Sequence, residues 1–139
     1  MKEDYITLRK TKTRGTKHTT PTIGLGLPLG EFCFYKPTVA LLQINPENQG
    51  LMFHLSKSKK EVKLELEEKL EDNYHLSDTK RTYARFTSKS LGELFANTFN
   101  ISMTSKHFFS VEKQTDTIFI MKLKETVANK RILSKNRPR

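Results

Sequence analysis

The stretch from Glu31 to Glu68 constrains the fold most, because it holds the densest apolar pattern in the chain. Phe32 and Phe34 predict a half-buried strand, and Pro37 then fits the first turn of a short helix. Residues 51–55 read as a buried strand that follows a turn-forming segment. The whole stretch therefore predicts strand, short helix, strand, turn and strand.

The last part of that stretch, Glu61–Glu67, alternates between apolar and charged residues. Val62, Leu64 and Leu66 fall on one face at a period of two, which is typical of a strand with one buried face. A helix is the alternative, because Glu, Lys and Leu are strong helix formers. Leu64 would lie on the wrong side of that helix, so we favour the strand.

The segment Ser88–Asn100 holds the best helix pattern in the chain. Ser90 and Glu93 have the spacing of a capping box, and Gly92 indicates a close packing contact because glycine otherwise lowers helix stability. An apolar stripe at helical spacing predicts the face that packs on the core. Its members are Leu91, Leu94, Phe95 and Phe99.

Three further segments read as strands: Lys80–Thr87, His107–Val111 and Thr117–Leu123. The last two are expected to form a hairpin.

Ile23–Gly30 is interpreted as a glycine-punctuated linker. A phosphate loop there is rejected, because no Gly-Lys-Ser/Thr follows and Pro28 interrupts the segment. The fold class expected is α+β, an antiparallel sheet with one main amphipathic helix and basic terminal arms.

The net charge of +10 is concentrated at the two ends of the chain. Residues 1–20 carry six Lys/Arg and two acids, residues 126–139 carry five and none, and the middle carries 14 against 13 acids. We expect a basic N-terminal arm over 1–22, a single α+β domain over 23–125 and a basic C-terminal tail over 126–139. Such segregation favours arms that reach an acidic surface; solubilising termini are the alternative.

The single cysteine, Cys33, predicts a buried structural thiol in a reducing compartment. No apolar run approaches the roughly 20 residues that span a bilayer, and the N-terminus has no hydrophobic signal region. The expected location is the cytoplasm, or a particle assembled inside a cell.

Catalytic and metal-binding motifs are not found in the sequence. The histidines, His18, His54, His75 and His107, are not paired with a recognisable nucleophile, and with Cys33 they lack the spacing of a metal site. We expect no cofactor, no metal and no enzymatic activity. A hydrolase that uses the acids between Glu61 and Asp72 is the catalytic alternative.

Nucleic-acid binding fits the basic groups better, because Lys and Arg hold phosphates and exposed aromatic rings stack on bases. Arg81, Tyr83 and Arg85 would share one face of a strand. Lys122 and Lys124 offer a further basic group on the last strand. The predicted nucleic-acid-binding residues are Arg9, Lys10, Lys12, Arg14, Lys17, Lys57, Lys59, Lys60, Lys80, Arg81, Tyr83, Arg85, Lys130, Arg131, Lys135, Arg137 and Arg139.

The order of the strands 51–55, 61–67 and 80–87, followed by the helix 90–99, resembles the single-strand-binding domain of the transcriptional coactivator positive cofactor four. That family includes small phage and bacterial relatives. The resemblance implies a curved antiparallel sheet, a homodimer and non-specific binding of single-stranded DNA. The piece 32–55 is also similar to the swapped-hairpin transition-state regulators, which bind duplex DNA as dimers.

The sequence thus predicts a non-enzymatic nucleic-acid-binding protein that prefers single-stranded DNA and acts as a homodimer or within a larger assembly, with no membrane partner. The alternative is a structural component of a nucleoprotein assembly, such as a virion or a ribosome. Basic extensions would then contact neighbouring subunits.

Overall fold

The computed structural model describes residues 19–77 and 83–128, with the backbone alone at Tyr83 and Ala128. Seven strands form one antiparallel sheet in the order β3-β4-β7-β6-β1-β2-β5. The strands are β1 (Thr22–Gly26), β2 (Glu31–Tyr35), β3 (Gln49–Ser56), β4 (Glu61–Glu68), β5 (Tyr83–Thr87), β6 (Ser105–Lys113) and β7 (Ile118–Ala128). The helices are α1 (Lys36–Leu42) and α2 (Lys89–Phe99).

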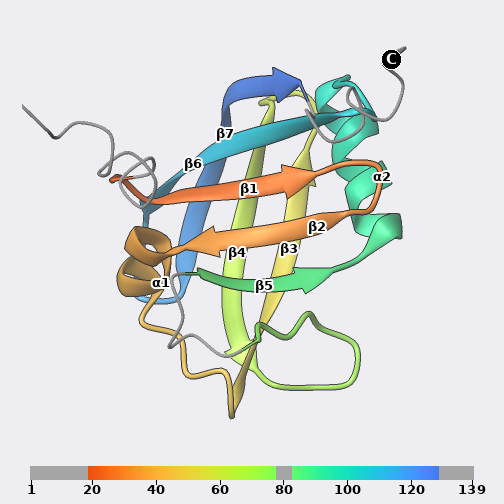
Figure 1. Ribbon diagram of the computed structural model, residues 1–139. Helices are drawn as coiled ribbons and strands as arrows, with labels where there is room; N and C mark the ends of the chain where they lie inside the picture. The colour runs from red at the N-terminus through yellow and green to blue at the C-terminus, as the bar shows by residue number, and fades with distance from the viewer. Residues whose placement is uncertain (1–18, 78–82, 129–139) are drawn as a thin grey trace, which may run out of the picture.

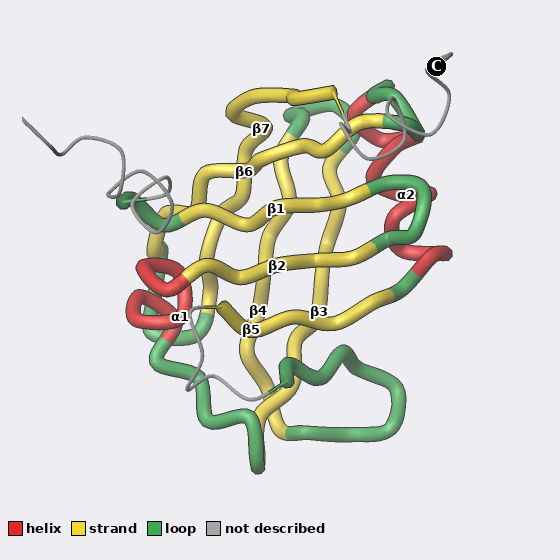
Figure 2. Tube along the Cα trace, in the orientation of Figure 1, coloured by secondary structure: helices red, strands yellow, loops and turns green. Residues whose placement is uncertain are grey.

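The sheet curls into a half-barrel. Figure 1 shows β6, β1, β2 and β5 across the front of the molecule, with β4 and β3 behind them at a steep angle. β7 pairs with both β6 and β4, so it joins the front of the curl to the back. Figure 2 shows the two helices at opposite ends of the front strands, where each closes one end of the curl.

The expected fold class, α+β with one main amphipathic helix, is wrong. The described chain is mostly β, and its helices contain 7 and 11 residues. The error has two physical sources. Strands β6 and β7 run longer than the apolar segments that predicted them, because charged residues continue their outward faces. A central strand was also missed altogether.

That missed strand is β1, which lies between β6 and β2 and not in a linker. Ile23 and Leu25 are fully buried on the inner face, while Gly24 and Gly26 occupy the outward positions. Glycine weakens a strand and adds no side chain to the alternating pattern. The sequence therefore read as a flexible segment, although its apolar residues keep a period of two.

The inner face of the curl is filled by aromatic rings. Phe32 on β2 stacks on Phe86 of β5 at 4.9 Å between ring centroids and meets Phe95 of α2 edge-on at 5.1 Å. Phe53 on β3 lies 5.9 Å from Phe86. Because β3 and β5 are the two ends of the strand order, this contact links the open edges of the sheet through the core.

A short segment, Tyr74–Ser77, bridges the same two edges through its backbone; we call it the strap. Tyr74 exchanges two backbone hydrogen bonds with Leu51 of β3, at 2.8 and 3.0 Å. Three residues later, the Ser77 amide donates to the Arg85 carbonyl of β5 (3.0 Å), and the Arg85 amide donates to Ser77 Oγ (3.0 Å). The strap thus satisfies backbone groups on both outermost strands.

Helix α2 begins two residues earlier than the capping-box spacing predicted. Ser88 is the N-cap, and its hydroxyl accepts a hydrogen bond from the Leu91 amide (3.2 Å). The predicted stripe is buried apart from Leu94, which is 55% exposed. The close contact at Gly92 is confirmed, because a Cβ there would lie 3.0 Å from the Gly30 Cα of the β1–β2 turn.

Strands are present where the sequence predicted them: around Phe32 and Phe34, at 51–55 and 61–67, and within 80–87, 107–111 and 117–123, of which 80–82 lie outside the described ranges. The final hairpin is confirmed by nine pairs between β6 and β7, with one bulge. β7 continues to Ala128, through residues that the sequence interpretation gave to the tail. Within the described ranges, neither helix has the length and apolar character that crossing a bilayer requires.

Candidate nucleic-acid interface

Three predicted residues, Lys57, Lys59 and Lys60, lie in the turn between β3 and β4, and all are exposed. Ser56 Oγ accepts a hydrogen bond from the Lys59 amide (3.2 Å), which fixes the first part of the turn. Lys60 adopts a left-handed conformation with φ of 56°, so the chain reverses sharply into β4. Three ammonium groups are thereby presented on one tight turn.

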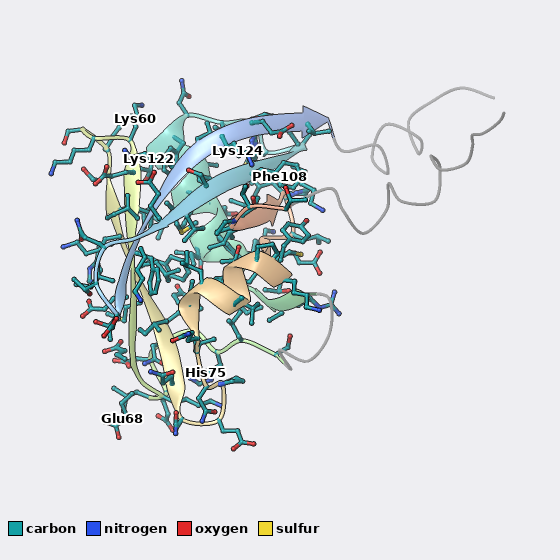
Figure 3. The ribbon with its side chains drawn as sticks, turned by 90° about the vertical axis from the view of Figure 1, so that its left-hand side faces the viewer. Lys60, Glu68, His75, Phe108, Lys122 and Lys124 are labelled. Atoms are coloured by element: carbon teal, nitrogen blue, oxygen red, sulfur yellow. The ribbon has the colours of Figure 1, made fainter. Side chains whose placement is uncertain are left out.

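Strand pairing brings two more lysines to this end of the sheet. Glu61, the residue after Lys60, is paired with Lys122 of β7. Two residues further along β7, Lys124 Nζ donates a 3.4 Å hydrogen bond to Thr20 Oγ1, just before β1. We call Lys57, Lys59, Lys60, Lys122 and Lys124 the basic end; Figure 3 shows its members Lys60, Lys122 and Lys124 in the same half of the molecule.

The five lysines of the basic end are available to an outside anion. All five are exposed, and within residues 19–77 and 83–128 none of them forms an ion pair; the ion pairs there are His54–Glu65, Arg85–Glu31 and Lys113–Asp116. Glu61 is the acid nearest in register. Exposed ammonium groups that no ion pair neutralises keep their attraction for phosphate.

The other end of β4 carries the opposite charge. Glu65, Glu67 and Glu68 lie on its second half, and Glu71 and Asp72 follow in the next turn. Figure 3 shows Glu68 at the far end of the molecule from Lys60. We call these five carboxylates the acidic end. The described body is therefore electrically polar along β4, although its charges nearly cancel in sum.

The predicted site is divided by the structure. Arg85 lies on the outward face of β5, but its guanidinium donates a 2.6 Å hydrogen bond to the Glu31 carboxylate, so it is partly neutralised. Tyr83 begins β5, and its side chain is not described. The other predicted residues lie outside the described ranges: Arg9, Lys10, Lys12, Arg14, Lys17, Lys80, Arg81, Lys130, Arg131, Lys135, Arg137 and Arg139.

The three described histidines each contact groups that hold the fold together. His107 is fully buried between Thr126 Oγ1 and the Ser102 carbonyl, both at 2.8 Å. His54 pairs with Glu65, and His75 contacts the Leu70 carbonyl at 2.7 Å. No cluster of three or more potential metal ligands occurs among the described residues.

Cys33 is buried, as its aromatic neighbours predicted. Burial raises the pKa of the Cys33 thiol above its ordinary value, and the Glu31 carboxylate raises it further. Lys106 and Arg85 act in the opposite direction on that pKa. A thiol held in its neutral form is a poor nucleophile, so this arrangement does not favour catalysis by Cys33.

Comparison with known proteins identifies no relative: no family model, no curated protein and no solved structure matches this chain. The resemblance to positive cofactor four stays a prediction. The strands on which it rests are separated in the sheet, because β3 and β4 lie at one end of the strand order and β5 at the other.

The sequence did not predict that β7 contributes to the basic end. Lys122 and Lys124 were visible as a basic pair, but nothing in the sequence showed that they lie beside a turn some sixty residues earlier. That proximity depends on the pairing of β4 with β7. Thr20 carried no signal at all, since it lies in a polar segment without periodicity.

Proposed function

We propose that this chain is a non-catalytic nucleic-acid-binding protein that contacts phosphates through its basic end and its basic N-terminal residues. The observation that supports this most directly is the hydrogen bond from Lys124 Nζ to Thr20 Oγ1. It places the start of the described chain at the basic end. The preceding residues 9–17 contain five Lys/Arg and no acid, so their attachment point adjoins five exposed lysines.

The acidic end supports a defined orientation of the bound polyanion. Phosphates are attracted to the lysines of the β3–β4 turn and repelled by the carboxylates at the opposite end of β4. A nucleic acid would therefore lie across the basic end and not along β4. Binding of this kind recognises the phosphate backbone and carries little sequence information.

Preference for single-stranded DNA is a finer proposal, and it needs an aromatic platform. The predicted platform was Tyr83 between Arg81 and Arg85, of which Arg85 is engaged by Glu31. We therefore base the proposal on phosphate contacts and treat strandedness as a quantity to be measured with single-stranded and duplex probes of one sequence.

The test is fluorescence anisotropy of a labelled oligonucleotide at rising salt. We expect log K to fall linearly with log salt, with a slope near 0.9 per phosphate contact for duplex and about 0.7 for single strands. In the variant Lys57→Gln/Lys59→Gln/Lys60→Gln, affinity should fall by about tenfold or more and the slope should flatten by up to about three contacts.

A matched control removes three positive charges elsewhere: Lys69→Gln/Lys89→Gln/Lys113→Gln. These lysines are exposed and lie outside the basic end. We expect a loss of affinity within about twofold, because distant exposed charges are largely screened. Equal losses in the two variants would show that net charge alone drives binding. Absence of binding at low salt would overturn the proposal.

A further inference from the structure

Two buried side chains lie on the outward face of the sheet, away from the core. Gly24 of β1 is paired with Cys33 of β2 on one side and with Phe108 of β6 on the other. Phe108 is 3% exposed and Cys33 is 8% exposed, yet neither belongs to the main hydrophobic cluster. Their neighbours along each strand, such as Phe109 and Phe34, point inward to that cluster.

Tyr35 packs over Gly24 and beside Phe108. A Cβ on Gly24 would lie 3.1 Å from Tyr35 Oη and 3.3 Å from Phe108 Cε1, so the tyrosine ring covers the glycine and meets the phenylalanine. The two ring centroids are 6.4 Å apart, and Lys106 Nζ lies 5.7 Å from the Phe108 centroid. We call Cys33, Tyr35 and Phe108 the outer cluster.

The outer cluster needs a covering layer to reach such low exposure. β1 contributes only glycines, Gly24 and Gly26, to the outward positions beside Phe108 and Lys106, so the middle of this face has no side chains of its own. Both helices point their buried apolar residues into the core cluster. Among the described residues, Tyr35 covers Gly24 and Lys106 Nζ lies over the Phe108 ring.

We propose that the outer cluster is the docking site of the chain's own first eight residues. Tyr5, Ile6 and Leu8 supply apolar side chains there, next to the acids Glu3 and Asp4. Lys106 and Arg85 lie beside Cys33, on which they act electrostatically. Arg85 is already paired with Glu31, so the acids suit the Lys106 ammonium, whereas residues 129–139 carry five Lys/Arg and no acid and would be repelled by it.

The length of the connecting chain permits this docking. Thr22 is paired with Ser110, two residues from Phe108 on β6, so the described chain starts close to the outer cluster. The ten residues 9–18 can span at most about 35 Å, which is several times the separation of two residues along a strand. The connecting residues are therefore long enough for this docking.

The consequence rests on the proposed function and deepens it. With residues 1–8 docked and Thr20 held by Lys124, the basic run 9–17 becomes a loop fixed at both ends beside the basic end. A loop that is partly ordered beforehand loses less conformational entropy when phosphates bind it. Nucleic acid would then contact the basic residues 9–17 and the lysines of the β3–β4 turn as one continuous surface.

Cys33 provides the test, because it is the single cysteine in the chain and lies in the outer cluster. The measurement is the rate at which a thiol-specific reagent modifies Cys33 in the folded full-length protein. In the variant Tyr5→Ser/Ile6→Ser/Leu8→Ser we expect that rate to rise by about tenfold, because the covering layer opens more often. The matched control Ile132→Ser/Leu133→Ser should leave it unchanged.

Each other result overturns the inference. A faster reaction in the Ile132→Ser/Leu133→Ser variant would assign the cover to the C-terminal residues. A rate unchanged in both variants would mean that the first eight residues do not protect the cluster. Protection that fades on dilution of the unmodified protein would assign the cover to a second copy.

Failure of this inference is distinct from failure of the proposed function. Salt-dependent oligonucleotide binding with an unchanged Cys33 rate would leave the function in place and overturn the docking. A raised Cys33 rate in a protein that binds no nucleic acid would do the reverse. Thermal melts of both serine variants verify that the fold is retained during thiol modification.

Discussion

At the scale of single residues, one amide side chain holds the turn after β4. Asn73 Nδ2 donates to the Glu68 carbonyl (2.7 Å) and to Glu67 Oε2 (3.3 Å), and Asn73 Oδ1 accepts from the Leu70 amide (3.1 Å). Gly50 makes room for it, because a Cβ at that position would overlap Asn73 Oδ1. Asn73 is 7% exposed, so displacing it would leave buried polar groups unpaired.

We expect Gly50→Ala to lower the free energy of unfolding by about 2–3 kcal/mol, measured by urea denaturation. The double variant Gly50→Ala/Asn73→Ala should cost little more than Asn73→Ala alone, because the overlap disappears with the amide. Gly26→Ala is the control, since its Cβ would meet the nearest backbone atom at an ordinary 4.0 Å. Additive costs in the double variant would contradict this account.

At the scale of elements, helix α2 depends on the residue that caps it. The capping-box spacing predicted Ser90 for this role, but the N-cap in the structure is Ser88. Its hydroxyl satisfies the Leu91 amide, one of the free donors of the first turn. Ser90 lies inside that turn, and its hydroxyl contacts Ser88 Oγ at 3.4 Å.

Replacing Ser88 with alanine should destabilise the protein by about 1 kcal/mol, because the Leu91 amide loses its acceptor. Ser90→Ala tests the alternative cap and should change stability by less than about 0.5 kcal/mol. The comparison needs only thermal or urea unfolding of three proteins. A larger loss in Ser90→Ala than in Ser88→Ala would show that the helix starts at the later serine.

At the scale of the whole molecule, the strap joins the two outermost strands of the sheet. Exposed strand edges are templates for association with other chains, and Tyr74 and Ser77 occupy backbone groups on both edges. The Tyr74 ring also stacks on Phe86 at 5.1 Å and meets Phe53 edge-on at 5.6 Å. The strap therefore closes the half-barrel by backbone and side-chain contacts at once.

Tyr74→Pro should release the strap, because proline has no N–H to donate to the Leu51 carbonyl. We expect a loss of about 3 kcal/mol in stability and, in sedimentation experiments, self-association that grows with protein concentration. Tyr74→Phe keeps the ring and the backbone bonds and is the control. If Tyr74→Pro sediments like the control at every concentration, the strap does not protect the edges.

Local patterns predicted most strands, because alternation in segments such as Glu61–Glu67 reports burial directly. Strand order was beyond the sequence, since pairs such as Glu61 with Lys122 depend on how the whole sheet curls. β1 was missed because its outward residues are glycines. The Lys57–Lys60 turn was predicted correctly as an exposed basic group, but its continuation onto β7 required the fold.

The charge separation along β4 gives the molecule an electric dipole, which acts before any contact is made. A body with lysines at one end and carboxylates at the other experiences a torque in the field of an approaching polyanion. During diffusion the molecule would rotate until the lysines of the β3–β4 turn face the polyanion, and it would reach the polyanion in the binding orientation. Asp116 lies in the hairpin turn that leads into β7 near Glu65. A fluorophore attached there would then face away from the nucleic acid, so it would report the approach of the two molecules without obstructing their contact.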